Sequence, residues 1–303
     1  MVVSLSHKTV VKYKAMNIIQ IYKTFPTQQD CINHMETVRW NNEPVCPYCK
    51  SKKQTPTKKG NRYHCNTCNT SYSVMVGTIF ENTKLDLQRW FLAISLVLNA
   101  KKGISARQLA RDIDVTKDTA WYMMMRIRKA IPTSGELLEG IIEADETYMG
   151  GKNNNRHENK KTKGGQGRGG EDKTAVAGLL QRNGNVIAKK VKDVSGKTLK
   201  SFINENVVKG SQIMTDEWKS YNGLNLLYGH SVVKHAMGEY VNGCMHTNTL
   251  EGFWSLLKRG VIGQYHYVTP KYLNMYINEF CFRYNNRGNE SIFENTLQKT
   301  LNI

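Results

Sequence analysis

The residues of this 303-residue chain that could do chemistry are three separated acids, Asp145, Asp216 and Glu251. In the stretch 141–147, branched apolar residues precede Asp145 and two neighbouring acids, a pattern that predicts a strand displaying a carboxylate near its end. Asp216 ends a second short apolar run, and Glu251 falls in the early turns of a predicted helix. A single acid of this kind is an ordinary cap or surface charge. Together, the three acids predict a site where close like charges require divalent cations, Mg²⁺ or Mn²⁺.

Two bound cations of this kind would suit phosphoryl transfer on a nucleic acid. Carboxylate-bridged ions could activate a water or a 3′-hydroxyl and stabilise the leaving oxygen of an in-line displacement. The working hypothesis is therefore a metal-dependent enzyme that cuts and rejoins DNA, with the upstream half of the chain delivering the DNA.

Four of the seven cysteines form two Cys-x-x-Cys pairs separated by fifteen residues. Each pair points two thiolates at one tetrahedral centre, and the spacing suits a zinc ribbon that binds structural Zn²⁺. Two disulfides are the alternative, which a reducing compartment disfavours. The segment between the pairs, 50–64, is rich in Lys and Arg, so the ribbon would present a basic hairpin. The predicted zinc ligands are Cys46, Cys49, Cys65 and Cys68.

The elements that must position the acids are predicted from apolar periodicity and turn residues. Beyond a boundary near 132–135 the order is three strands, helix, strand, helix, strand, helix. The acids fall on the first strand, at the end of the fourth and on the last helix. This is the layout of an α/β, RNase H-like domain, in which a mixed sheet brings separated acids to one rim. The predicted strands are 141–147, 174–180, 186–191, 212–216 and 230–235, and the predicted helices are 195–208, one opening near 217, and 247–259.

The upstream half is predicted to be mostly helical. A helix from Thr27 to Trp40 has a capping signal in Asp30, three residues after Thr27. A short helix over 105–113, a turn and a longer basic helix from Thr116 make a helix-turn-helix, whose second helix would enter a major groove. A structural helical hairpin would look similar. The expected DNA contacts on the longer helix are Lys117, Arg126 and Arg128.

These elements give five predicted segments: an N-terminal helical segment (1–44), a zinc ribbon (45–80), a helix-turn-helix region (81–132), a catalytic domain (138–290) and a C-terminal tail (291–303). Within the catalytic domain, 150–173 is too polar and Gly-rich to pack, so it is predicted to be a basic loop. Its excess charge beside the acids favours a clamp on phosphates over a solvated insertion. The cations expected to contact DNA there are Lys161, Lys163 and Arg168, joined by Arg259 downstream.

The charge of the whole chain points to a polyanionic partner. Lys and Arg number 43 against 25 Asp and Glu, a formal charge of +18. Each neutralised phosphate releases counterions, so double-stranded DNA is the leading partner, and an anionic membrane is the weaker one. The longest apolar run is too short to span a bilayer and the N-terminus lacks a signal-peptide core, so a cytoplasmic, nucleoid-associated protein is expected.

Several of these stretches together resemble the DDE-class transposases of bacterial insertion sequences, in the group related to Merlin elements, whose catalytic part is known as the ISXO2-like transposase domain. The resemblance covers nearly the whole chain, and its most specific motif is 246–259. The matching stretches are Cys46-Pro47-Tyr48-Cys49, Gly77-Thr78-Ile79-Phe80, the helix-turn-helix over 107–128, Glu143-Ala144-Asp145-Glu146-Thr147-Tyr148, Gly150-Gly151-Lys152, Thr215-Asp216, and His246-Thr247-Asn248-Thr249-Leu250-Glu251-Gly252-Phe253-Trp254-Ser255-Leu256-Leu257-Lys258-Arg259.

The resemblance implies a transposase that binds terminal inverted repeats, cuts the ends of its element and joins the 3′-hydroxyls to a target. It implies Asp145 and Asp216 as the first two metal ligands. The third is assigned to Glu251, because Lys258 lies two turns along the same helix face, where it could meet a phosphate. Asn248 is the second candidate, either as a neutral ligand or as the helix cap.

The resemblance also implies a homodimer or larger assembly on DNA, because two element ends must be paired, and a bacterial or archaeal host. Two other readings remain open. A non-catalytic zinc-ribbon and helix-turn-helix regulator predicts broken acids, whereas all three positions carry carboxylates. A structure-specific RNase H-like nuclease would share the fold and metals but would not join strands.

Overall fold

The structure, a computed structural model, describes residues 16–57, 60–131, 135–150, 173–233 and 247–301. The chain forms two compact units. Unit 1 comprises Met1–Asn99, Leu109–Ala130 and Gly288–Ile303, and unit 2 comprises Ala100–Gln108 and Ile131–Arg287. Within the described ranges, no helix is long and apolar enough to cross a membrane.

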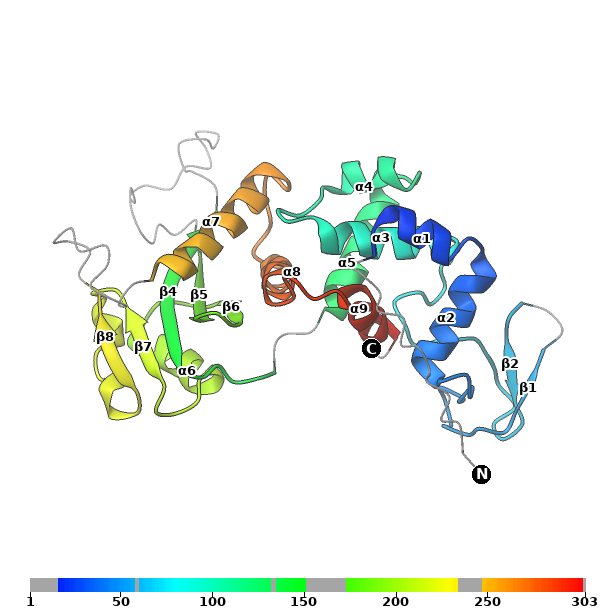
Figure 1. Cartoon of the computed structure of the whole chain (residues 1–303), viewed down its shortest axis with the longest axis horizontal. Coiled ribbons are helices and arrows are strands. Elements are labelled where there is room, and N and C mark those ends of the chain that lie inside the picture. The colour runs from blue at the N-terminus through cyan, green and yellow to red at the C-terminus, as the bar shows by residue number, and fades with distance from the viewer. Residues whose placement is uncertain (1–15, 58–59, 132–134, 151–172, 234–246, 302–303) are drawn as a thin grey trace, which may run out of the picture. The chain divides into compact units, whose positions relative to one another are not determined.

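Unit 1 is built around helix α3, whose buried side chains include Trp90, Phe91 and Ile94. Helices α1, α2, α5 and α9 each pack against α3. A small antiparallel sheet extends from this bundle (Figure 1). The helices are α1 (Ile18–Thr24), α2 (Gln28–Trp40), α3 (Leu87–Asn99), α5 (Lys117–Ala130) and α9 (Ile292–Leu301), and the strands are β1 (Gln54–Pro56), β2 (Tyr63–Cys65) and β3 (Ser71–Tyr72).

The start of α2 confirms the predicted capping signal. The backbone N–H of Asp30 donates to the Thr27 hydroxyl at 3.2 Å, and the Thr27 backbone N–H donates to the Asp30 carboxylate at 3.0 Å. The predicted short helix and longer helix are also present, as α4 (Ala106–Asp112) and α5, with Asp114 in the left-handed region of the turn between them.

The C-terminal residues are not a tail. Ile292–Leu301 form helix α9, and its side chains Phe293, Leu297 and Leu301 are buried in unit 1. The Phe293 ring meets Phe91 of α3 edge to face, with ring centroids 5.6 Å apart. The prediction of a tail was wrong because this helix buries its apolar side chains in unit 1, where it contacts α2, α3 and α5, all of them far earlier in the chain.

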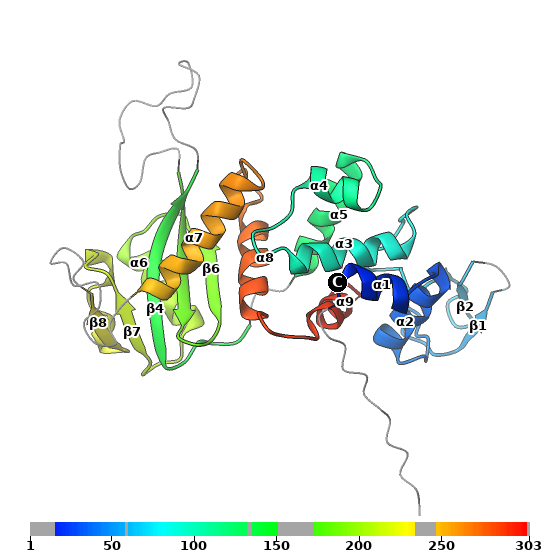
Figure 2. The same cartoon turned by 45° about the horizontal axis from the view of Figure 1, so that its top comes forward.

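Unit 2 is a five-stranded mixed sheet with helices on both faces, the predicted RNase H-like arrangement (Figure 2). The spatial order is β6-β5-β4-β7-β8, in which β4 pairs antiparallel with β5 and parallel with β7. Its elements are β4 (Ile141–Met149), β5 (Thr174–Gln181), β6 (Val186–Lys190), α6 (Gly196–Asn206), β7 (Gln212–Thr215), β8 (Gly229–Val232), α7 (Asn248–Gly263) and α8 (Leu273–Asn285).

Alternation along β5 sets the two faces of the sheet. Val176 and Leu180 pack with α7 and α8, whereas Ala177 and Leu179 pack with α6. One expected element differs from the prediction: between β7 and β8 the chain makes two short 3₁₀ turns, η3 (Lys219–Tyr221) and η4 (Leu224–Leu226), instead of a helix. The predicted strand 230–235 begins at Gly229, and its last residues lie outside the described ranges.

Candidate active site

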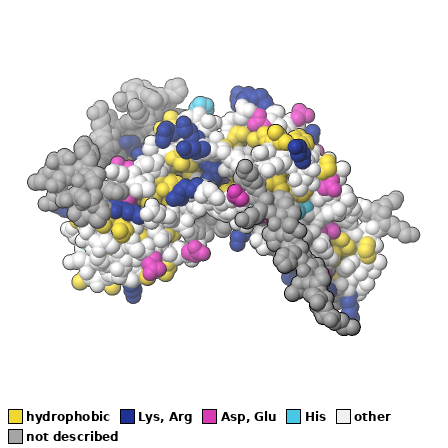
Figure 3. Space-filling model, viewed as in Figure 1, with side chains coloured by type: hydrophobic (Ala, Val, Ile, Leu, Met, Phe, Trp, Pro, Cys, Tyr) yellow, Lys and Arg dark blue, Asp and Glu magenta, His cyan; other side chains and the backbone are white. Residues whose placement is uncertain are grey.

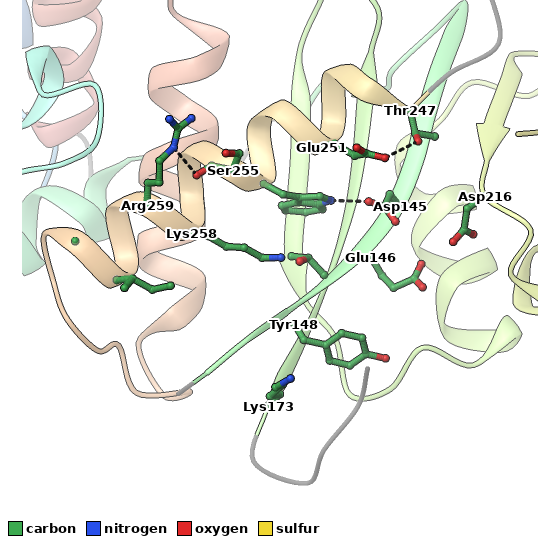
Figure 4. Close-up of a pocket in the computed structure, with 14 residues that line it drawn as sticks. Asp145, Glu146, Tyr148, Lys173, Asp216, Thr247, Glu251, Ser255, Lys258 and Arg259 are labelled. Atoms are coloured by element: carbon green, nitrogen blue, oxygen red, sulfur yellow. Dashed lines mark hydrogen bonds between the residues drawn. The ribbon is translucent and has the colours of Figure 1, made fainter. Parts of the chain in front are cut away.

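The sheet brings the three predicted acids to one pocket of about 1120 Å³ in unit 2. Asp145 comes from the central strand β4, Asp216 directly follows the neighbouring parallel strand β7, and Glu251 comes from α7. Figure 4 shows the three carboxylates directed into the same space from these three elements. Parallel pairing of β4 and β7 explains the meeting of the two aspartates, because it places both acids toward the same edge of the sheet.

The carboxylate of Asp145 is mostly enclosed. The indole N–H of Trp254 in α7 donates to its Oδ2 at 3.0 Å, drawn as a dashed line in Figure 4. Burial is the main cause that raises the pKa of Asp145 from 3.8 to about 6. The negative charges of Asp216 and Glu251 add to this rise, and the hydrogen bonds that Asp145 accepts oppose it. The site therefore resists the ionised form of Asp145 unless a cation compensates its charge.

A fourth carboxylate, Glu146, belongs to this cluster. One carboxylate oxygen from each of Asp145, Glu146 and Asp216 can be chosen so that all three lie within 4.8 Å of one another. The hydroxyl of Tyr221, whose side chain is buried, donates to Glu146 Oε2 at 2.9 Å. Oxygen-only donors at this spacing fit a hard divalent cation such as Mg²⁺ or Mn²⁺. The sequence prediction left Glu146 out, although its place in the acid run was a signal.

The acid Glu143 has a different role, because it is fully buried and holds α7 against β4. Its carboxylate accepts from the backbone N–H of Leu250 at 2.9 Å and from the Thr249 hydroxyl at 3.0 Å. It also pairs with Arg182 at 3.0 Å. A carboxylate at the first turn of a helix satisfies a free N–H and suits the positive end of the helix dipole. Glu143 thereby positions the helix that carries Glu251.

The far side of the pocket is basic. Lys258 and Arg259 line it from α7, and Lys173 lines it from the segment before β5. In Figure 3, Lys and Arg side chains gather over the C-terminal half of α7. The two predicted cations of α7 thus lie about two turns beyond Glu251 on the same helix. Asn248 does not join them: its side chain is exposed, it is not among the pocket residues, and the helix cap is Thr247.

The four predicted zinc ligands converge at the base of the small sheet in unit 1. Their Sγ atoms all lie within 4.8 Å of one another, with Cys49 and Cys65 at 3.4 Å and Cys46 and Cys68 at 3.7 Å. Tetrahedral zinc with Zn–S bonds of about 2.3 Å needs S···S distances of about 3.8 Å. Hydrogen bonding, chiefly from the backbone N–H of Cys68, lowers the pKa of Cys65 to about 6, which favours a thiolate. These residues fit Zn²⁺.

The cations predicted on α5 fall in different environments. Lys117 is exposed and pairs with Asp118 at 3.0 Å. Arg126 is half-buried and donates to the Thr78 carbonyl at 3.1 Å. Arg128 differs from the expectation of an exposed cation, because its side chain is only 2% exposed. Lys161, Lys163 and Arg168 lie outside the described residues.

Comparisons with known proteins give family matches in both units. Residues 137–285 match the family model described as the ISXO2-like transposase domain, and residues 26–71 match the transposase zinc-ribbon domain. The chain is also similar to the "Uncharacterized protein in transposable element ISH50" of Halobacterium salinarum, at 29% identity over 273 residues, covering 86% of this chain and 92% of the relative.

Solved structures give a weaker likeness. A chain of the Mos1 strand transfer complex matches 70% of this chain and 74% of its own length, at 12% identity and a TM-score of 0.28. A chain of a pre-cleavage Mos1 transpososome matches 69% and 74%, at 12% identity and a TM-score of 0.27. At these scores the likeness adds nothing to the fold described above.

Proposed function

Because the chain carries both domains of one transposase family, the ISXO2-like transposase domain and the transposase zinc-ribbon domain, we propose that it moves an insertion sequence. It binds the terminal inverted repeats of the element, cuts the DNA at its ends and joins the 3′-hydroxyls to a target. The observation that carries the proposal is the meeting of Asp145, Asp216 and Glu251 in one pocket whose far wall is basic.

The carboxylates of the pocket would hold the metal ions. Asp145 and Asp216 are the first two ligands and Glu251 is the third, with Glu146 close enough to share in the same site. A bound pair of Mg²⁺ or Mn²⁺ ions supplies Lewis-acid activation of the attacking oxygen and stabilises the leaving oxygen. Asn248 is not assigned to this set, because it is exposed and lies outside the pocket lining.

The pocket's own cations bind the DNA strand. Lys258 and Arg259 would contact phosphates next to the scissile bond, where their charges offset the phosphate charge and fix its distance from the acids. The helix pair α4 and α5 would bind the duplex of the terminal repeat, with the exposed Lys117 as a phosphate contact. The zinc ribbon adds a second contact to the repeat, and two chains assemble on two paired ends.

Strand transfer in vitro tests the proposal. The reaction contains a labelled duplex with the element's own terminal repeat, a plasmid target and Mg²⁺. We expect Asp145→Asn, Asp216→Asn and Glu251→Gln each to lose joining by about 1000-fold or more, since each removes several kcal/mol of metal-dependent stabilisation. Asn248→Ala serves as the matched control on the same helix, and we expect it to stay active.

Two outcomes would redirect the assignment. A wild-type protein that binds the repeat but never cuts or joins under any divalent metal would be a DNA-binding regulator. A protein that cuts but never joins would be a nuclease. The zinc assignment is tested separately by elemental analysis, which should find about one zinc per chain, and Cys46→Ser with Cys65→Ser should abolish it.

A further inference from the structure

Trp254 makes a contact with the candidate site that ordinary core packing does not require. Its side chain is 4% exposed, and its indole N–H donates to Asp145 Oδ2 at 3.0 Å. An indole nitrogen donates one hydrogen bond, accepts none and does not bind metal. The contact therefore constrains the orientation of the Asp145 carboxylate without competing with it for a cation.

A glycine on the next strand makes room for this indole. Gly178 of β5 is paired with Asp145 in the antiparallel register. A Cβ built at Gly178 would lie 2.5 Å from two ring carbons of Trp254, far too close for real atoms, and 3.3 Å from Leu250, a tight contact. The backbone of Gly178 is not in the left-handed region, so its conformation does not demand glycine. Glycine inside a strand weakens the strand, and what it provides here is the space that the ring fills.

A second bond from α7 to β4 fixes the direction of the helix. Glu143 accepts from the backbone N–H of Leu250, and Asp145 accepts from the side chain of Trp254. Two residues of strand span about 6.7 Å, and four residues of helix span about 6 Å. The spacing of the two acceptors along β4 therefore matches the spacing of the two donors along α7, so both hydrogen bonds can form at once. Glu251 lies between the two helix residues that make these bonds.

We propose that Trp254 is a positioning residue of the candidate active site: its indole N–H holds Asp145 Oδ2 and aligns that carboxylate with Glu251, in space that Gly178 leaves open. This inference rests on the proposed function, because it assumes that Asp145 binds a divalent metal. Loss of a hydrogen bond that orients a metal ligand typically weakens metal binding by 10- to 100-fold.

Two substitutions distinguish the contribution of the indole N–H from that of the ring's packing. Trp254→Phe keeps a large apolar ring but removes the N–H, and Gly178→Ala keeps the N–H but displaces the ring. We expect both to weaken Mn²⁺ binding, measured by titration calorimetry, by about 10-fold or more. The matched control is Phe253→Leu, because Phe253 is buried beside Trp254 with ring centroids 5.4 Å apart and its side chain has no hydrogen-bond donor that could reach the acids. It should lower the melting temperature and leave the Mn²⁺ affinity unchanged.

A spectroscopic readout tests the hydrogen bond itself, first in the metal-free protein and then on addition of Mg²⁺. The indole ¹H–¹⁵N signal of Trp254 is identified as the one absent from Trp254→Phe. We expect that signal to shift in Asp145→Asn and in Gly178→Ala, and to shift in the wild type on titration with Mg²⁺, with the same midpoint as binding. An indole signal that ignores Asp145→Asn would overturn the inference.

The two proposals fail in different ways. If the wild type binds Mn²⁺, Asp145→Asn does not, and Trp254→Phe binds as tightly as the wild type, the positioning role is wrong and the metal site stands. If Asp145→Asn binds Mn²⁺ as tightly as the wild type, or the wild type binds none, the metal site of the proposed function fails and the positioning role fails with it. If Phe253→Leu weakens binding as much as Trp254→Phe does, the effect is packing alone and the inference is overturned.

Discussion

At the scale of single residues, the candidate site lowers the stability of the metal-free fold. Burial and the charges of Asp216 and Glu251 raise the pKa of Asp145 from 3.8 to about 6. The unfolded chain therefore ionises Asp145 at lower pH than the folded chain does. Stability is lost as the pH rises from about 4 to about 6 and stays at the lower value above that range, by up to about 3 kcal/mol.

Asp145→Asn should remove this penalty. In the metal-free protein we expect the substitution to raise the free energy of unfolding at pH 7 by about 2 kcal/mol. We expect little effect at about pH 3, below both pKa values, where most of the wild-type carboxyl is protonated in the folded and the unfolded state. Urea unfolding of both proteins across this pH range measures the difference. Asp118→Asn is the matched control at an exposed acid, and it should change stability by less than about 0.5 kcal/mol.

Mg²⁺ should invert this order. A cation that binds only the folded wild type stabilises it by mass action, whereas Asp145→Asn has lost a ligand and gains less. A wild type that remains less stable than Asp145→Asn at saturating Mg²⁺ would argue against the metal site. Equal stabilities at every pH would argue against the raised pKa.

At the scale of elements, periodicity predicted the strand over 141–147 but not the roles of its acids. Glu143 and Asp145 lie on the same face of β4. The sequence around them does not indicate which acid is buried beneath a helix and which lines the pocket. What separates them is α7, whose first turn caps Glu143 and whose next turn brings Trp254 to Asp145 at the wall of the pocket. The carboxylate of Glu146 lies close to those of Asp145 and Asp216 and also accepts a hydrogen bond from Tyr221, a contact between residues 75 positions apart.

The anchor at the start of α7 should therefore control both stability and the site. Glu143→Gln keeps the shape of the side chain but leaves Arg182 facing a neutral amide at 15% exposure. We expect a loss of about 3 kcal/mol, the usual result of breaking a buried ion pair, and faster hydrogen exchange at the Leu250 amide. Thr249→Val removes one neutral hydrogen bond to the same carboxylate and should cost about 1 kcal/mol. A change of less than about 0.5 kcal/mol in Glu143→Gln would contradict this role.

At the scale of the whole molecule, the spacing of residues along the chain was enough to predict the zinc ribbon, but not to predict which helices form unit 1. The ribbon follows from two pairs of cysteines within 23 positions, so the sequence shows it directly. Unit 1 is closed by α9, and the contacts that define its place join residues far apart in the chain. The ring of His34 in α2 bonds Glu294 in α9 at 2.9 Å, across 260 positions. An amphipathic segment at a chain end carries no local sign of such partners.

The chain's last helix should therefore stabilise its first helices. Deletion of 288–303 exposes the surfaces that Phe293, Leu297 and Leu301 cover, each worth about 1.5–3 kcal/mol when fully buried. Their sum is comparable to the whole stability of a typical domain. We expect the truncated protein to lose the fold of unit 1 and to keep the sheet of unit 2, because no residue of that sheet is deleted.

Limited proteolysis with mass spectrometry distinguishes the two units. In the truncated protein, cleavage within 16–99 should become rapid while 173–233 remains protected. Leu297→Ala in the full chain is the milder version and should destabilise unit 1 by about 2–5 kcal/mol, since Leu297 is fully buried. Lys299→Ala, at an exposed position of the same helix, is the matched control and should leave the digestion pattern unchanged. Unchanged protection of 16–99 after the deletion would show that α9 is dispensable, and that the N-terminal helices hold together through α3 alone.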